Sequence, residues 1–339
     1  MAAEESSPRD FLWRDGERIV VFRRGALAAA PQLLAEQGWR RFHLLSTERA
    51  LATAPEGMRG DAAALHFVPP GGVPEAAAAI LAEVNTDDLV ALGGGRVIDT
   101  AKAIAAVRGG RVAAIPTTLS GAEMTRIHRL PAGHQGIPLI RPALVLADPD
   151  AMASQPEAAM RASAMNALAH GADSLYTPFS NPVATMAALR GAELFADALD
   201  KLPEERDSAA IALASLLCAY ALDSALFALH HVLCQTIVRI CGTPHAETNA
   251  AMLPRTMDAM RSRAPGAIGR LAIALGAEPE AIGERIAGLA GGPTALSDLG
   301  ADRSLLPEVV RAAAARTELQ FMPDPPDAAG LERLLAEAW

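Results

Sequence analysis

A short apolar segment that runs into three glycines and then into a helical pattern is the feature that most constrains the fold. Residues 88–92 form a nearly continuous apolar run, residues 93–95 are glycines, and apolar residues recur at helical spacing from Arg96 onward. A buried strand, a tight turn and a helix in this order begin a βαβ unit, which pairs strands in parallel. Glycines let the backbone approach a phosphate closely, and the positive end of the following helix favours a diphosphate. The segment therefore predicts a parallel α/β sheet with a dinucleotide site at the turn.

Strand and helix patterns alternate through the rest of the first half of the chain. Strands are predicted at residues 18–22, 41–46, 65–68 and 88–92, from Val112, and at 142–148; helices are predicted at 26–38, at 74–84 and from Arg96. An Asp-Pro pair at 148–149 ends the alternation, and the remaining apolar residues recur at helical spacing with no clear strand. We therefore predict an α/β dinucleotide-binding domain at residues 1–149 and an all-helical catalytic domain at residues 150–339.

Polar residues near the glycine turn suggest further contacts. The strand from Val112 opens into a loop with three hydroxyl residues that could hold a nucleotide or a substrate, namely Thr117, Thr118 and Ser120. Ser46 ends the second strand, at a position where a carboxylate would select NAD over NADP. Because no carboxylate stands there, we predict that the protein tolerates both cofactors. Asp99 and Lys102, on the helix after the glycines, are predicted to form a local pair at the helix surface.

Charge and composition limit the classes of partner. The chain has 339 residues and a net charge of −9, which argues against nucleic acid or an anionic membrane as the main partner. Residues 1–15 contain no long apolar run, so we expect neither a signal peptide nor a membrane anchor there. Three cysteines without paired metal-type spacing are typical of a reducing compartment. We therefore expect a cytoplasmic protein.

Amide and imidazole side chains gather in the Ala-rich second half. Asn166 and His170 lie four residues apart in a helical pattern, so they share one face of the helix. His231 and His245 follow in two later segments. A lone histidine is usually a satisfied core residue, but three in this pattern favour a ligand or metal site. Structural roles are predicted for four others, His43, His66, His134 and His230.

Five motifs carry a resemblance to a known family. They are Gly-Gly-Gly-Arg-Val-Ile-Asp-Thr-Ala-Lys (93–102), Ile-Pro-Thr-Thr-Leu-Ser-Gly-Ala-Glu-Met (115–124), Met-Asn-Ala-Leu-Ala-His (165–170), His-His-Val-Leu-Cys (230–234) and Pro-His-Ala-Glu-Thr (244–248). Together they resemble the iron-containing (metal-dependent) alcohol dehydrogenase superfamily, and within it the chain looks most like the maleylacetate reductases. The likeness extends over residues 19–300 and weakens toward the C-terminus.

The resemblance implies the dehydroquinate synthase-like fold of that superfamily, with an α/β dinucleotide-binding domain and an all-α domain. It also implies an enzyme that uses NADH or NADPH, and we expect a homodimer. The predicted cofactor-binding residues are Gly93, Gly94, Gly95, Arg96, Thr117, Thr118, Ser120 and Ser46.

The metal ligands of the superfamily fall on Asn166, His170, His231 and His245. Metal-dependent members have an aspartate at the first of these positions, and the amide is the form seen in maleylacetate reductases. Three neutral imidazoles and a neutral amide offer a divalent cation no anionic ligand. The resemblance therefore predicts that Fe²⁺ or Zn²⁺ binds weakly, if at all.

The chain also departs from the family pattern at several positions. Gln235 stands where the family usually has a histidine beside the reacting centre, and a glutamine cannot shuttle a proton near neutral pH. Arg96 replaces a serine of the glycine turn, and Arg23 and Arg24 stand in a normally glycine-rich entry. Residues 318–323 replace the Asn-Pro-Tyr-type segment of the family.

The leading hypothesis is an NAD(P)H-dependent reductase of a small unsaturated or oxo carboxylic acid, similar to maleylacetate reductase. Its predicted catalytic residues are Asn166, His170, His231, Gln235 and His245. Arg23 or Arg126 would hold a carboxylate of the anionic substrate. The departures leave two alternatives open: a non-redox isomerase, lyase or cyclase on the same scaffold, and a catalytically silent binding subunit.

Overall fold

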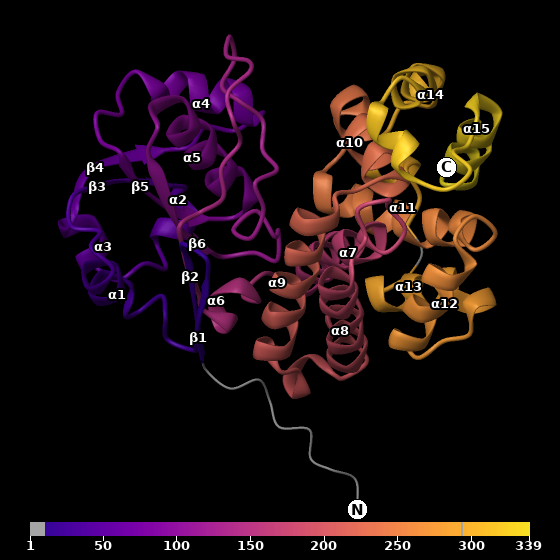
Figure 1. The fold of residues 1–339 in the computed structure, drawn as a ribbon, viewed down its shortest axis with the longest axis horizontal. Helices are drawn as coiled ribbons and strands as arrows, with labels where there is room; N and C mark the ends of the chain where they lie inside the picture. Colours follow the sequence, from indigo (N-terminus) through magenta and orange to yellow (C-terminus); the bar gives the residue numbers. More distant parts are fainter. Residues whose placement is uncertain (1–10, 293) are drawn as a thin grey trace, which may run out of the picture. The chain divides into compact units, whose positions relative to one another are not determined.

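A computed structural model describes residues 11–292 and 294–339, and the side chains of residues 16–292 and 294–339. The prediction that residues 1–15 contain no signal peptide or membrane anchor concerns mostly residues 1–10, which lie outside the described residues. The chain divides into two compact units, one ending at Gln155 and the other beginning at Pro156 (Figure 1). The division falls shortly after the boundary predicted at residue 149, because a short helix after the last strand packs Ala151 against the core of the first unit.

The first unit contains a seven-stranded sheet in the order β1-β2-β7-β6-β5-β3-β4. Its strands are β1 (Phe11–Asp15), β2 (Arg18–Phe22), β3 (Phe42–Ser46), β4 (Ala62–Phe67), β5 (Asp88–Gly93), β6 (Arg111–Pro116) and β7 (Leu144–Ala147). All neighbouring strands are parallel except β1 and β2, which are antiparallel. The predicted parallel α/β sheet is confirmed, with β1 as an additional edge strand that was not predicted.

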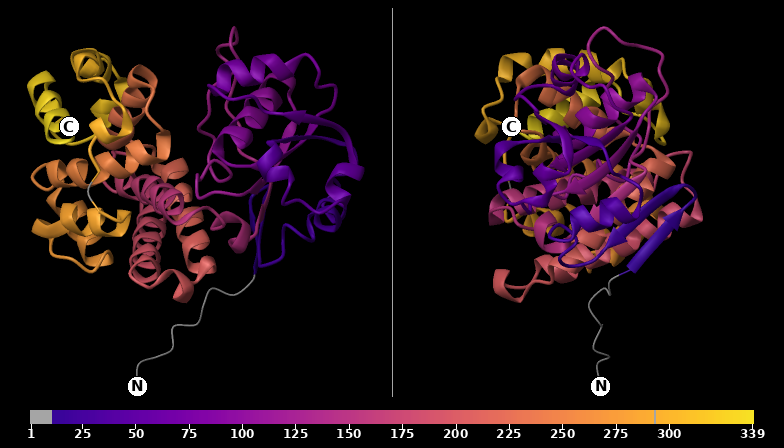
Figure 2. Two further views of the ribbon diagram at one scale, coloured as in Figure 1. Left: turned by 180° about the vertical axis from the view of Figure 1, so that it is seen from behind. Right: turned by 90° about the vertical axis from the view of Figure 1, so that its left-hand side faces the viewer.

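Helices cover both faces of this sheet (Figures 1 and 2). They are α1 (Ala30–Glu36), α2 (Glu48–Leu51), α3 (Gly57–Gly60), α4 (Val73–Leu81), α5 (Gly95–Arg108) and α6 (Pro149–Met152). Along β5, Val90 and Leu92 pack into the core under α1 to α3, while Leu89 and Ala91 pack against α4 and α5. Both faces of β5 are buried, and this explains why its sequence is a continuous apolar run and not an alternating one.

The described residues of the second unit form helices joined by loops and contain no strand, as predicted. Its α-helices are α7 (Glu157–Ser174), α8 (Pro182–Leu199), α9 (Ser208–Ala225), α10 (Leu229–Cys241), α11 (His245–Met260), α12 (Pro265–Ala274), α13 (Ile282–Ala290), α14 (Leu306–Ala314) and α15 (Ala328–Glu337). The central helix is α7, which contacts α8, α9, α10, α11 and α13 and is buried at every position from Ala162 to Ser174. The polar side chains of a helix enclosed on all sides need hydrogen-bond partners inside the protein or on a ligand. The polar residues of α7 are therefore candidates for a functional site.

One helix of the described residues is long and apolar enough to cross a membrane. It is α9, and 72% of its apolar window is buried inside the protein, as expected for a core helix of a globular domain.

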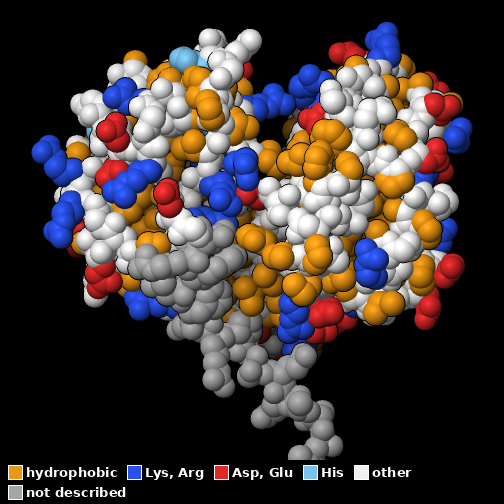
Figure 3. All heavy atoms as spheres, viewed as in Figure 1, with side chains coloured by type: hydrophobic (Ala, Val, Ile, Leu, Met, Phe, Trp, Pro, Cys, Tyr) orange, Lys and Arg blue, Asp and Glu red, His pale blue; other side chains and the backbone are white. Residues whose placement is uncertain are grey.

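Acidic and basic side chains are interspersed on the face drawn in Figure 3.

Candidate functional site

The glycine turn between β5 and α5 lies directly against the hydroxyl-rich loop that follows β6. A Cβ atom added to Gly94 would lie 3.0 Å from Thr118, and one added to Gly95 would lie 2.9 Å from Ser120. Gly93 has a φ of +156°, a conformation that residues with a side chain rarely adopt. No side chain caps the start of α5. The turn thus brings together the predicted cofactor residues of both segments, and no side chain occupies the N–H groups at the start of α5.

Lys102 fastens the hydroxyl-rich loop to α5. Its Nζ donates hydrogen bonds to the carbonyl oxygens of Ala122 (2.9 Å), Thr125 (2.9 Å) and Ile127 (3.3 Å), and it pairs with Asp99 at 2.8 Å. The local pair with Asp99 is confirmed, but its predicted place at the helix surface is wrong, because the Lys102 side chain is fully buried. A lysine within the apolar stripe of α5 was the signal for this role.

The same loop contains a buried acid, Glu123. Neither of its carboxyl oxygens has a hydrogen-bond partner. Burial raises the pKa of Glu123 to about 7, although the positive charge of Lys102 opposes the shift. Near neutral pH this carboxyl group therefore exists in both its neutral and its charged form.

The remaining residues predicted at the cofactor or substrate in the first unit differ in exposure. Ser46 is fully buried and donates its hydroxyl to the Leu92 carbonyl oxygen at 2.8 Å, so it ties β3 to β5 and does not support a cofactor contact. Thr117 is half-buried. Arg96 and Arg126 are exposed and Arg23 is half-buried, so their side chains are accessible to an anion.

In the second unit, α7 and α10 bring two of the predicted histidines together. The rings of His170 and His231 stack with their centroids 4.9 Å apart. Asn166 lies one turn before His170 on α7. Three buried atoms here lack a hydrogen-bond partner: Oδ1 of Asn166, Nδ1 of His170 and Nε2 of His231. Buried polar atoms are rarely left unpaired, so this cluster points to a ligand site.

Asp173, which the sequence analysis did not single out, organises this cluster. Its carboxylate accepts hydrogen bonds from the backbone N–H groups of Ala228 (3.1 Å), His230 (3.3 Å) and His231 (3.1 Å) at the start of α10. It also accepts the hydroxyl of Tyr176 and, at 2.8 Å, Nδ1–H of His231. One side chain on α7 therefore fixes both the first turn of α10 and the orientation of the His231 ring.

The charges of the cluster follow from these contacts. Burial acts to raise the pKa of Asp173, but the hydrogen bond and charge interactions with His231, together with those of His230 and Tyr176, outweigh it and lower the pKa to about 2. Burial, aided by the charges of His231 and His245, holds the pKa of His170 well below its usual range. Asp173 is therefore ionised and His170 neutral near neutral pH.

The other predicted residues of the helical unit have different surroundings. His245 begins α11 and is exposed, although its charge acts on His170. Gln235 lies one turn after His231 on α10 and is half-buried. His230 is satisfied in the core, with Thr256 Oγ1 and Asn249 Oδ1 each 2.9 Å from its ring nitrogens, in agreement with its predicted structural role.

The donor set fits a metal ion only in part. His231 has the hydrogen bond from Nδ1 to a carboxylate that commonly orients metal-binding histidines, and its Nε2 lone pair is then directed away from Asp173. Among the described residues, however, no group of three or more His, Cys, Asp or Glu side chains is arranged to hold a metal ion. Asn166 adds no charge. A divalent cation held by Asn166, His170 and His231 would therefore meet no carboxylate or thiolate ligand among these three.

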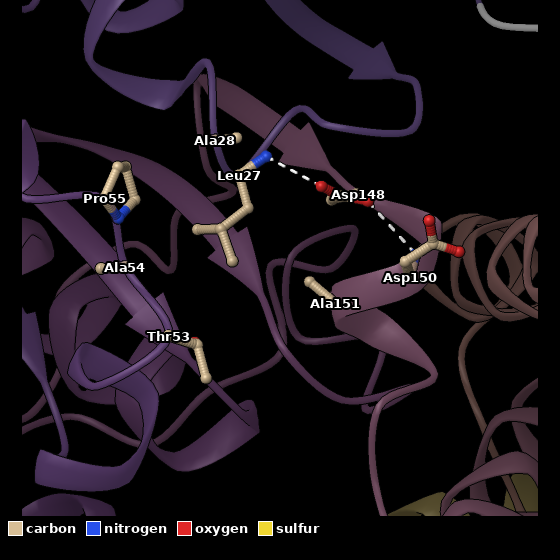
Figure 4. Close-up of a pocket in the computed structure, with 8 residues that line it drawn as sticks. All are labelled: Leu27, Ala28, Thr53, Ala54, Pro55, Asp148, Asp150 and Ala151. Atoms are coloured by element: carbon tan, nitrogen blue, oxygen red, sulfur yellow. Dashed lines mark hydrogen bonds between the residues drawn. The ribbon is translucent and has the colours of Figure 1, made fainter.

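A separate surface pocket of about 370 Å³ lies within the first unit (Figure 4). Asp148 borders it and accepts the backbone N–H groups of Leu27 at 3.0 Å and Asp150 at 3.2 Å. None of the residues predicted to bind the cofactor lines this pocket.

Comparison with known proteins places the chain in a family. Residues 17–149 match the iron-containing alcohol dehydrogenase family, and residues 160–339 match the C-terminal part of the same family. The chain belongs to the iron-containing alcohol dehydrogenase family. It is therefore an oxidoreductase of the predicted superfamily, with a small-molecule substrate and nicotinamide-dependent chemistry.

Individual relatives narrow the comparison within the family. Maleylacetate reductase 2 of Cupriavidus pinatubonensis is 36% identical over 76% of each chain, and maleylacetate reductase 1 of Rhodococcus opacus is 32% identical over 99% of this chain and 98% of that one. The structure is similar to that of maleylacetate reductase from Agrobacterium tumefaciens, with a TM-score of 0.83, 28% identity and 98% of each chain covered. The chain is thus a reductase of this type, and the alternative of a non-redox enzyme on the same scaffold is not favoured.

The contact between the glycine turn and the loop gives a first prediction. We expect Gly95→Ala to weaken NADH binding by about 5- to 150-fold, because the new Cβ would overpack against Ser120 at a cost of about 1–3 kcal/mol. Calorimetric titration with NADH measures the effect. Gly269→Ala is the matched control, because nothing lies within 4 Å of the added Cβ. Equal affinity of the two variants for NADH would show that the glycine turn is not part of the cofactor site.

Proposed function

We propose that this enzyme reduces maleylacetate or a closely similar unsaturated oxo acid with NADH or NADPH. The observation that carries the proposal is the buried pair His170 and His231, whose unpartnered ring nitrogens lie together in a chain related along its length to maleylacetate reductases. With the diphosphate of the cofactor bound at the glycine turn, its nicotinamide ring would supply the hydride. Gly94 and Gly95 are proposed to meet the diphosphate, and Thr118 and Ser120 to lie on the nicotinamide side.

The histidine pair would stabilise the oxygen on which negative charge develops. With Nδ1–H donated to the ionised Asp173, a neutral His231 ring has only a lone pair at Nε2. To donate to an enolate or alkoxide oxygen, His231 must therefore carry a second proton at Nε2, and the hydrogen bond from Nδ1 to Asp173 fixes the ring in the orientation for that donation. His170 stays neutral beside it. His231 is then the proton donor, because Gln235 cannot release a proton near neutral pH.

We propose that this proton-donating role does not depend on a tightly bound metal. The neutral donor set and the absence of a three-residue cluster among the described side chains support weak binding of Fe²⁺ or Zn²⁺ at Asn166, His170 and His231. We further propose a cytoplasmic homodimer that tolerates both nicotinamide cofactors. The three free cysteines, Cys218, Cys234 and Cys241, support a reducing compartment.

Steady-state reduction is the test of the proposed function. We expect NADH and NADPH both to be oxidised in the presence of maleylacetate, with no more than about a hundredfold difference in kcat/KM, which corresponds to nearly 3 kcal/mol. Oxidation is followed by nicotinamide absorbance across a panel of oxo acids, with calorimetric titration of each nucleotide as the companion measurement. Absence of turnover with every acid, together with absence of nucleotide binding, would refute the proposal.

A further inference from the structure

Two departures from the family pattern meet at one side chain, Arg316. Its Nη2 donates a hydrogen bond to Oε1 of Gln235, a residue of α10, at 3.1 Å. Its Nε and Nη2 also donate to the two carboxyl oxygens of Glu318, at 3.1 and 2.6 Å. Gln235 stands in place of the usual histidine, and Glu318 begins the segment that replaces the usual C-terminal motif. The two replacements are therefore parts of one hydrogen-bonded group.

This group lies close to the histidine pair. The guanidinium carbon of Arg316 is 5.9 Å from the ring centroid of Phe227, and the Phe227 centroid is 5.6 Å from that of His231. Gln235 is one helical turn from His231 on α10. All of these residues belong to the helical unit, so their arrangement does not depend on the position of the nucleotide-binding unit.

The contact explains why a glutamine suits position 235. A guanidinium only donates hydrogen bonds, so it must face the amide oxygen of Gln235, and the amide NH₂ group must point elsewhere. A histidine at this position would present a second positive charge to Arg316 whenever it was protonated. Glutamine accepts the arginine at any pH. Gln235 therefore cannot relay a proton, but it holds the guanidinium of Arg316 in place.

Arg316 keeps donors available for a ligand. Its two N–H groups on Nη1 have no hydrogen-bond partner among the residues that the structure describes, while Nε and Nη2 are fully used. The side chain is 22% exposed, so a ligand can reach it. Hydrogen bonding from Arg316 lowers the pKa of Glu318, which keeps that carboxylate ionised and the guanidinium held in one orientation.

We propose that Arg316 is a specificity-determining residue that binds a carboxylate of the substrate through Nη1, with Gln235 and Glu318 as its positioning residues. This inference rests on the proposed function and names the chemical group that the site selects: a carboxylate on the carbonyl compound to be reduced. It assigns to the helical unit the anion-binding role that the sequence suggested for Arg23 or Arg126.

The test compares an oxo acid with its methyl ester, which has the same carbonyl group without the charge. In Arg316→Gln we expect kcat/KM for the acid to fall by about 10- to 100-fold through KM, with kcat little changed and the ester unaffected. Arg316→Lys, which keeps the charge but not the planar fork, should recover part of the loss. Arg311→Gln, an exposed arginine of α14, is the control for the change in net charge and should leave both substrates unchanged.

Binding of the oxo acid without turnover separates this inference from the proposed function. In calorimetry, Arg316→Gln should weaken binding of the acid by the same factor, whether or not the enzyme reduces it. Equal losses for acid and ester, or unchanged binding of the acid, would overturn the role of Arg316. If Arg316→Gln does not fold, the wild-type enzyme decides: a kcat/KM for the ester equal to that for the acid contradicts the inference, and a preference for the acid of about tenfold or more supports it.

Discussion

Replacing Asp173 by asparagine is expected to lower kcat by about a hundredfold and to destabilise the protein by about 3–5 kcal/mol. The carboxylate is fully buried and both of its oxygens accept hydrogen bonds: Oδ1 from His230 and Tyr176, and Oδ2 from Ala228 and His231. An amide would turn one of these acceptors into an NH₂ group that faces other donors. It would also weaken the contact that fixes the orientation of the His231 ring.

The two effects can be measured separately. Thermal unfolding followed by circular dichroism gives the stability of Asp173→Asn, and kcat is then measured at a temperature at which the variant remains folded. Asp197→Asn makes the same chemical change at an exposed position of α8 and should alter neither quantity. Wild-type kcat in a folded Asp173→Asn protein would show that His231 acts without its carboxylate partner.

The second large effect concerns the metal. Asn166→Asp is expected to increase the affinity for Zn²⁺ or Fe²⁺ by about a hundredfold or more, because a carboxylate would join the two histidines with a negative charge. Oδ1 of Asn166, Nδ1 of His170 and Nε2 of His231 are already buried without hydrogen-bond partners. We expect the wild-type protein to carry less than one metal ion per chain and to remain active in chelator.

Elemental analysis and calorimetric titration with Zn²⁺ measure this change independently of activity. Gln135→Glu is the control, because it also turns a neutral amide into a carboxylate, at an exposed position of the other unit. One tightly held ion per wild-type chain, with activity lost on its removal, would contradict the account and make the enzyme an ordinary metal-dependent dehydrogenase.

The sequence was most informative where local pattern and tertiary structure agree. Strands β3, β5, β6 and β7 are almost entirely buried, so their apolar runs were recognisable, and the three consecutive glycines indicated a tight turn. Edge strand β1 (Phe11–Asp15) mixes charged and apolar residues and was missed. Its antiparallel pairing with β2 depends on a two-residue turn at Gly16 and not on an apolar run.

The candidate site was harder to predict, because its key contacts join residues far apart in the chain. Asp173 lies three residues after His170, yet its partners are the start of α10, more than fifty residues later. Arg316 and Gln235 are separated by 81 positions. The histidines could be recognised by their rarity and spacing, whereas Asp173 and Arg316 are common residue types whose contacts appear only in the folded chain.

The most direct test of the central claim is transfer of deuterium from C4 of the nicotinamide to the substrate. Protein is mixed with excess maleylacetate and NADH that is labelled with deuterium on both C4 positions, and the product is analysed by mass spectrometry after one turnover. The account predicts a reduced product with one deuterium bound to carbon and one equivalent of oxidised nicotinamide. A product without deuterium, or labelled NADH that remains unconsumed while the substrate is converted, would contradict it.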